Sequence, residues 1–150
     1  MKKIFVSWIG KTDLRAVTET ETVGLGPIAQ ALDARNFDEA VLISDYSESE
    51  VQTFLDWLRQ RTPTTINIMF EKLSAPTNFG EIYEAATKAC LTALANQRGT
   101  RELTCHLSPG TPAMAAVWII LAKTKFPAEL IESSRERGVQ TASVPFDILS

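Results

Sequence analysis

Histidine and cysteine are scarce in this sequence, and their scarcity excludes several kinds of chemistry. The 150-residue chain has one histidine, His106, and two cysteines, Cys90 and Cys105. These residues do not have the spacing of a zinc site, and two cysteines so placed do not form a disulfide framework. We therefore expect two buried free thiols, no metal site and no cofactor.

The chain also lacks a strong charge of either sign and a long apolar run. Its net charge of −3 provides no general attraction to duplex DNA. The longest apolar run, residues 112–122, is well short of the roughly 20 residues that cross a bilayer, and the start, MKKIFVSWIG, has no signal-peptide cleavage site. We expect a single cytoplasmic domain over residues 1–150, without a membrane partner and without direct duplex DNA binding.

Common nucleotide-binding and hydrolase motifs are absent or misplaced. There is no Walker A motif, no glycine two residues before the serine of LSPGT, and no pair of carboxylates at catalytic spacing. GLGPIA, residues 24–29, matches a dinucleotide-binding fingerprint, and Asp45 stands where a ribose-binding acid would follow. However, about 15 residues separate this fingerprint from the preceding strand, which it must follow at once. We therefore expect no nicotinamide or flavin binding, and we interpret Gly26 as a helix cap or turn before Pro27.

Short apolar strands alternate with amphipathic helices along most of the chain. This alternation is typical of a parallel sheet that is covered on both faces. The loop over residues 10–26 has no obvious structure, and loops of this length are usually functional or mobile. Strands are predicted at residues 4–9, 40–44, 65–70 and 103–108, and helices at 27–35, 47–61, 79–97 and 112–123.

The end of the chain departs from this alternation. The segment ESSRERG, between apolar residues 130–131 and 139–144, is too short for the crossover helix that parallel strands need. A hairpin is the better interpretation. The predicted fold is therefore an α/β, Rossmann-like three-layer sandwich with a mostly parallel sheet and a C-terminal antiparallel hairpin. Because the sequence stops soon after a strand, we expect a domain cut from a longer protein.

Polar residues gather where the predicted strands end, and ligands of open α/β sheets bind beyond these carboxyl ends. In the loop after the first strand, Lys11 can meet a phosphate, and Thr12 and Asp13 can hydrogen-bond a sugar. The alternative is a plain solvated, charged loop. Serines also lie at three strand ends, as Ser7, Ser44 and Ser108.

The turn before the last helix has the residues of an anion site. Thr111 is a natural N-cap, and Pro112 suits the first helical position. Free amides near Ala113 and Met114, with the helix dipole behind them, would attract a phosphate or a sugar edge. Gly110 allows a ligand to approach the backbone closely.

His106 and Ser108 lie two residues apart, on one side of the predicted strand. A nucleophile and its base are one interpretation of this pair. Against it, side chains at this spacing project in parallel, and no orienting acid is evident. The other interpretation is a hydrogen-bonded interior histidine.

Three segments carry a resemblance to a known family. The block LSPGTPAMAAVWIILAKTKFPAELIESSRERGVQTASVPFDI, with SWIGKTDL and PTNFGEIY, resembles the amino-terminal sensor domains of RtcR-like, sigma-54-dependent bacterial transcription activators. These sensors belong to the CARF group, the CRISPR-associated Rossmann fold. The resemblance implies a homodimer whose paired crevices bind cyclic oligoadenylate or a related RNA-derived ligand. It also implies an attached AAA+ ATPase and helix-turn-helix, neither of which lies in this sequence, so the domain is truncated or stands alone.

The resemblance further implies which residues contact the ligand. It points to the loop after the first strand, to the turn of residues 108–111, and more weakly to Asn78. With the residues identified above, the candidate ligand contacts are Ser7, Trp8, Gly10, Lys11, Thr12, Asp13, Ser44, Asn78, His106, Ser108, Pro109, Gly110, Thr111 and Met114.

Two functions follow from this resemblance. The first is a ligand sensor that controls a transcription activator. The second is a metal-independent ring nuclease, in which Lys11 would stabilise the transition state and His106 or Ser108 would assist. Residues 108–114 contain no second basic residue, which disfavours cleavage.

Overall fold

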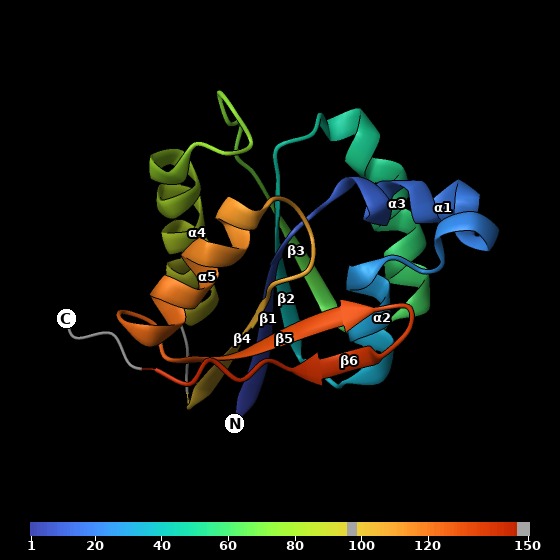
Figure 1. The fold of residues 1–150 in the computed structure, drawn as a ribbon. Coiled ribbons are helices and arrows are strands. Elements are labelled where there is room, and N and C mark those ends of the chain that lie inside the picture. Colours follow the sequence, from blue (N-terminus) through green and yellow to red (C-terminus); the bar gives the residue numbers. More distant parts are fainter. Residues whose placement is uncertain (96–98, 147–150) are drawn as a thin grey trace.

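A six-stranded sheet runs through the centre of the molecule (Figure 1). The computed structural model describes residues 1–95 and 99–146. The strand order is β3-β2-β1-β4-β5-β6, in which all neighbours are parallel except the antiparallel β5–β6 hairpin. The strands are β1 (Lys2–Trp8), β2 (Glu39–Ser44), β3 (Thr65–Phe70), β4 (Arg101–His106), β5 (Ala128–Ser134) and β6 (Gly138–Thr141). The predicted fold class is confirmed.

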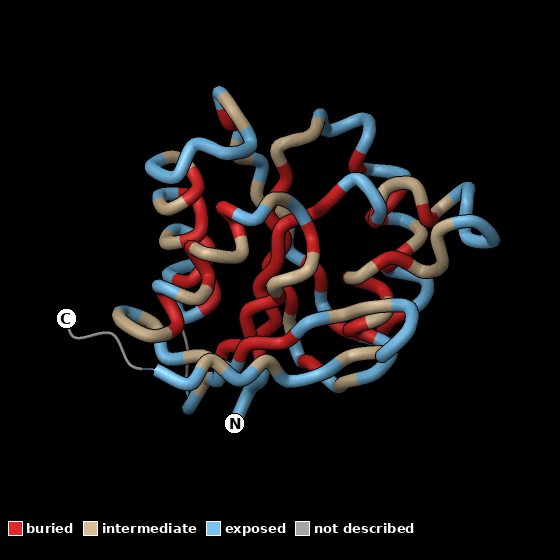
Figure 2. Tube along the Cα trace, in the orientation of Figure 1, coloured by how far each residue is buried: buried red, intermediate tan, exposed pale blue. Residues whose placement is uncertain are grey.

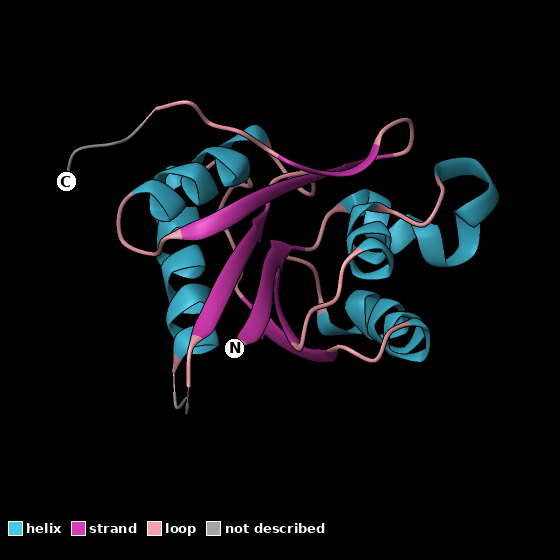
Figure 3. Cartoon of the chain, turned by 90° about the horizontal axis from the view of Figure 1, so that it is seen from below, coloured by secondary structure: helices cyan, strands magenta, loops and turns pink. Residues whose placement is uncertain are grey.

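Helices cover both faces of the sheet and complete the three layers (Figures 1 and 3). One face carries α1 (Lys11–Val23), α2 (Pro27–Ala34) and α3 (Glu48–Arg61), and the other carries α4 (Phe79–Leu94) and α5 (Pro112–Lys123). None of the described helices is long and apolar enough to cross a membrane.

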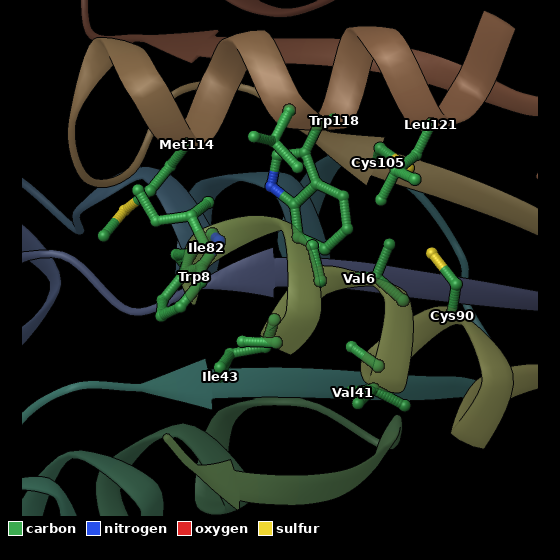
Figure 4. Packing of buried hydrophobic residues seen from close by; sticks show 14 of the residues in the cluster. Val6, Trp8, Val41, Ile43, Ile82, Cys90, Cys105, Met114, Trp118 and Leu121 are labelled. Atoms are coloured by element: carbon green, nitrogen blue, oxygen red, sulfur yellow. The ribbon is translucent and has the colours of Figure 1, made fainter. Parts of the chain in front are cut away.

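Alternation along the strands divides the core between the two faces. In β1, Ile4, Val6 and Trp8 pack toward α4 and α5, whereas Phe5 packs toward α2 and α3. This division follows from the strand geometry, which points successive side chains to opposite faces. Both layers are buried next to the sheet and exposed outside it (Figure 2), and Figure 4 shows the α4–α5 layer at close range. That layer includes Cys90, which is a buried free thiol, as is Cys105.

Side chains cap the first turns of three helices, and the cap at Thr111 is confirmed as predicted. Ser47 accepts a hydrogen bond from the amide of Glu50 at the start of α3, Asn78 does so from Glu81 in α4, and Thr111 from Met114 in α5. Each cap satisfies an amide that the helix itself leaves without a partner. Gly26 is the N-cap of α2, with Pro27 at the first helical position, as predicted.

The prediction of an unstructured loop over residues 10–26 is wrong. Residues 11–23 form α1, which lies against α3. The helix escaped prediction because it buries only Asp13 and Ala16 and therefore has no apolar stripe. Several predicted boundaries also shift: β4 ends at His106, β6 at Thr141 and α4 at Leu94, and part of the predicted 79–97 helix lies outside the described residues.

Candidate ligand-binding crevice

A cavity of about 360 Å³ lies beyond the carboxyl ends of β1 and β4. The chain leaves β1 into α1 on one face of the sheet and leaves β4 into α5 on the other, so the connections diverge here. The lining contains the eight candidate contact residues of the two predicted loops, together with three residues that the sequence analysis missed. It consists of Gly10, Lys11, Thr12, Asp13, Pro27, Tyr46, Pro76, Ser108, Pro109, Gly110 and Thr111.

The two loops approach each other closely at a pair of glycines. A Cβ atom at Gly10 would lie 3.0 Å from the backbone nitrogen of Gly110 and 3.4 Å from the Cβ of Pro109. Gly110 has a φ of +88°, and a Cβ there would collide with the Sδ of Met114. Glycine at both positions therefore brings the backbones of the two loops together, at the base of a narrow crevice.

Asp13 lies beneath this crevice and is completely buried. Its carboxyl group accepts hydrogen bonds from the amides of Gly10 and Ile28, both at 2.9 Å. It thus joins the start of α1 to the start of α2. Burial raises the pKa of Asp13 to about 7, although the two amide hydrogen bonds oppose the shift. Both oxygens already have backbone partners, so the structure assigns Asp13 to support of the crevice rather than to a sugar.

The positive character of the crevice comes from Lys11 and from the starts of α1 and α5. Lys11 is exposed at the first position of α1 and lines the cavity. Helix N-termini carry partial positive charge that favours anions. The anion site predicted at α5 needs correction, because the Met114 amide donates to Thr111 Oγ1 and is not free. Thr111 Oγ1 in turn donates to the carbonyl of Pro76, 2.8 Å away.

His106 is an interior histidine and does not line the crevice. Its Nδ1 lies 3.1 Å from Ser7 Oγ, and its Nε2 lies 2.8 Å from Ser133 Oγ. Ser7 Oγ donates to the Trp8 carbonyl, which assigns the imidazole proton to Nδ1 and leaves Nε2 to accept from Ser133. Burial lowers the pKa of His106 to about 3, so the ring is neutral at physiological pH.

His106 and Ser108 do not form a nucleophile and base pair. The hydroxyl of Ser108 accepts a hydrogen bond from the Ser133 amide at 2.7 Å, and the imidazole contacts the Ser133 hydroxyl. Both residues are therefore tied to β5. Of the two, Ser108 alone lines the crevice.

Several predicted contact residues lie beneath or beside the crevice rather than in its lining. Trp8 and Met114 belong to the packed layer between the sheet and α4–α5 (Figure 4). The Ser7 hydroxyl is buried against His106, and Asn78 caps α4. Alternation explains the errors for Ser7 and Trp8, because the last side chains of a buried strand point into the layers above and below the sheet.

Ser44 is also buried, and it positions Tyr46, one of the three lining residues that the sequence analysis missed. Its hydroxyl oxygen accepts a hydrogen bond from the Tyr46 amide at 2.9 Å. Tyr46 is half-buried and lines the crevice opposite the turn after β4. A single tyrosine in a short loop carries no periodic signal, and its position just after β2 was the one available clue.

No family model and no curated protein matches this chain. Two solved structures, however, are similar to this chain in fold. Csm6 from Enterococcus italicus, solved bound to cyclic hexa-2′-fluoro-hexa-dAMP, superposes with a TM-score of 0.70 at 18% identity over 93% of this chain and 35% of that one. VC1899 from Vibrio cholerae superposes with a TM-score of 0.64 at 15% identity over 93% of this chain and 33% of that one.

These similarities establish the fold. Shared structure at so low an identity shows a common Rossmann-like architecture and leaves the chemistry to be argued from the site. The chain spans about a third of the length of each of these two proteins.

Proposed function

We propose that this domain is a ligand sensor that binds a cyclic oligoadenylate, or a related RNA-derived nucleotide, in the crevice between β1 and β4. The observation that carries the proposal is the crevice itself, where Lys11 and the starts of α1 and α5 meet at the point where the sheet connections diverge. The fold shared with Csm6, whose solved structure holds a cyclic hexanucleotide analogue, supports the same ligand class.

The dimensions and chemistry of the crevice suit part of such a ring. Its volume of about 360 Å³ lies at the lower end of the usual range for small-molecule sites, enough for one nucleotide unit. A phosphate would lie beside Lys11, and the hydroxyl groups of Thr12 and Ser108 are available for a ribose edge. A ring of several nucleotides needs more surface than one crevice offers, and a homodimer would provide it by pairing two crevices.

The helix α5 is the element that would carry the signal from the ligand. It begins at the crevice with Thr111 and packs through Trp118 and Leu121 against the sheet and α4. Displacement of its first turn would therefore shift a rigid, buried helix. By the resemblance to RtcR-like sensors, the receiver would be an AAA+ ATPase with a helix-turn-helix in the full-length regulator.

Calorimetric titration of the purified chain with cyclic tetra- and hexaadenylate tests this proposal. We expect tight binding and no turnover, and we expect Lys11→Ala to weaken binding about tenfold by removing a phosphate contact. The matched control is Lys3→Ala, because Lys3 is also exposed but lies at the opposite end of β1. RNA with a 2′,3′-cyclic phosphate end is the third ligand. If the chain binds this RNA and neither cyclic oligoadenylate, the ligand is an RNA end rather than a cyclic oligoadenylate.

A ring nuclease on the same fold is the second candidate, and the position of Lys11 in the crevice is the observation in its favour. The geometry provides few other groups that could catalyse cleavage. His106 is neutral, buried and bonded on both ring nitrogens, and the Ser108 hydroxyl accepts from Ser133. Linear adenylate products that disappear in Lys11→Ala would replace the sensor proposal by this one.

A further inference from the structure

A second cavity, of about 400 Å³, lies next to the crevice at the carboxyl ends of β2 and β3. Tyr46 lines both cavities, so the two are adjacent. The chemistry of the second cavity differs from that of the first, because aromatic rings and carboxylates dominate it. Its lining consists of Ser44, Asp45, Tyr46, Ser47, Glu50, Phe70, Glu71 and Lys72.

Hydrogen bonds hold the floor of this cavity together. The amide of Glu71 donates to the carbonyl of Ser44 at 2.9 Å, and the amide of Leu73 donates to Asp45 Oδ1 at 2.7 Å. These contacts join the ends of β2 and β3. The bond from the Tyr46 amide to Ser44 Oγ then fixes Tyr46 above the same floor. The cavity is therefore preorganised, and its two aromatic residues come from backbone that is held in place.

Two aromatic faces are available in the cavity. Phe70, the last residue of the edge strand β3, is 41% exposed, so one face of its ring is open to the cavity. Tyr46 is half-buried, and its ring packs against the apolar layer below. Exposed aromatic faces of this kind are the surfaces on which nucleobases stack.

The charges of this cavity suit a base better than a phosphate. Asp45, Glu50 and Glu71 contribute carboxylates, and Lys72 is the cation in the lining. Lys88 of α4 pairs with both carboxylate oxygens of Glu71, so Asp45 and Glu50 contribute most of the negative charge. Burial raises the pKa of Tyr46, and the negative charges of Asp45 and Glu50 add to the shift. A phosphate would be repelled here, whereas an exocyclic amino group finds carboxylate oxygens that accept its hydrogen bonds.

We propose that this second cavity is the base subsite: an adenine stacks on Tyr46 or Phe70 and donates its amino group to a carboxylate. The phosphate of the same nucleotide lies beside Lys11 in the crevice. This inference rests on the proposed function, because it assumes an adenylate ligand. It adds the groups that would recognise adenine, because the crevice by itself offers only contacts to phosphate and ribose.

Titration of single variants with cyclic hexaadenylate tests the stacking step. We expect Tyr46→Ala and Phe70→Ala each to weaken binding, by about tenfold for whichever ring carries the base. Tyr46→Phe keeps the aromatic face and should recover the binding that Tyr46→Ala loses. Leu91→Ala is the control, because Leu91 is an exposed apolar residue of α4 outside both cavities. Circular dichroism of each variant checks that it is folded.

Two further probes report on the base directly. Cyclic hexaadenylate with one adenine replaced by 2-aminopurine should lose fluorescence on binding, and the variant that removes the stacking ring should abolish this quenching. Cyclic hexainosinate, which has a carbonyl in place of the amino group, should bind at least about tenfold more weakly than cyclic hexaadenylate. Glu50→Gln should reduce this discrimination if Glu50 is the acceptor, and Glu71→Gln if Glu71 is.

The outcomes separate this inference from the proposed function. If cyclic hexaadenylate binds in a Lys11-dependent way and both Tyr46→Ala and Phe70→Ala stay within twofold of the wild type, the base subsite is wrong and the sensor stands. If neither cyclic tetra- nor hexaadenylate nor the cyclic-phosphate RNA binds the wild type, both proposals fall. Loss of binding in either aromatic variant, with normal binding by Leu91→Ala and quenching that depends on that ring, supports the subsite.

Discussion

The helices α1 and α5 both begin at the crevice, yet different groups hold their first turns. At α5 the neutral Thr111 hydroxyl accepts a hydrogen bond from the Met114 amide and donates one to the carbonyl of Pro76. At α1 the buried carboxyl group of Asp13 accepts hydrogen bonds from the amides of Gly10 and Ile28. The two walls of one site can therefore differ in their response to mutation and to pH. The predictions below test this difference.

The largest expected effect comes from the packed body of α5. Trp118 is almost completely buried between α5, the sheet and α4, and Trp118→Ala should lower the free energy of unfolding by about 3–5 kcal/mol. Urea denaturation measures this loss. Ile120→Ala, on the exposed side of the same helix, is the control and should cost much less. Equal losses in the two variants would mean that α5 is not anchored by its buried face.

Asp13→Ala should have the next largest effect. The substitution leaves the buried amides of Gly10 and Ile28 without their acceptor, which costs about 1–3 kcal/mol for each amide. Urea denaturation at pH 5, where the carboxyl is protonated in the folded state, should show a loss of about 2–4 kcal/mol. Asp33→Ala removes a carboxylate from an exposed ion pair with Arg61 and should change the stability by less than about 1 kcal/mol. A similar loss in both variants would contradict the supporting role of Asp13.

The pH dependence of stability should distinguish the α1 support from the interior histidine. The folded-state pKa of Asp13 is raised from 3.8 to about 7, so its contribution to stability is full below about pH 3.8 and is lost as the pH rises to about 7. The pKa of His106 is lowered to about 3, so its contribution is full above about pH 6.5 and is lost as the pH falls. Between pH 4 and 6.5 a rise in pH therefore removes the Asp13 contribution to the free energy of unfolding and restores the His106 contribution.

The substitution Asp13→Asn removes the pH-dependent contribution of Asp13 to stability and leaves that of His106. The stability of this variant should rise between pH 4 and 6.5 by about 1 kcal/mol per pH unit relative to the wild type. Urea denaturation of both proteins at pH 4.5, 5.5, 6.5 and 8 gives the comparison. Parallel curves over this range would show that Asp13 does not titrate as its burial implies.

The smallest expected effect is at the local cap. Thr111→Ala should destabilise the chain by about 1 kcal/mol, the usual value of a single N-cap. Asn78→Ala, at the cap of α4, should cost a similar amount in thermal unfolding. Only Thr111→Ala should also weaken the binding of cyclic hexaadenylate, because Thr111 lines the crevice and Asn78 lines neither cavity. Equal binding by both variants would remove Thr111 from the site.

Residue patterns within one segment were enough to predict much of this fold. The strand order could not be read from them, but the alternation of short apolar strands with amphipathic helices predicted a sheet covered on both faces, as the structure shows. The helix α1 was missed because such patterns within a segment are all that the sequence analysis could use. Its sequence, KTDLRAVTETETV, has no stripe because the helix packs through few residues, and its stability comes from contacts with α2 and α3.

The lining of the crevice was predicted for the residues of two loops and missed for residues that other segments bring to it, such as Tyr46. Lys11, Thr12 and the turn of residues 108–111 line the crevice as the strand-end rule and the resemblance imply. Ser7 and Ser44 were predicted as ligand contacts, yet each supports another side chain or loop from below. Sequence position alone cannot separate these cases, because a strand end places some side chains at the edge of the sheet and others inside it.

The sequence by itself determined the features that act over a few residues: the period of the strands, the caps at Ser47, Asn78 and Thr111, and the glycine at Gly110. Tertiary structure alone decided which of the polar groups face a ligand. It buried His106 between Ser7 and Ser133, residues far from it in the chain, and it placed Tyr46 at the junction of two cavities. Burial and the choice of hydrogen-bond partner depend on segments that meet only in the folded chain, so the chemistry of each group is settled after folding.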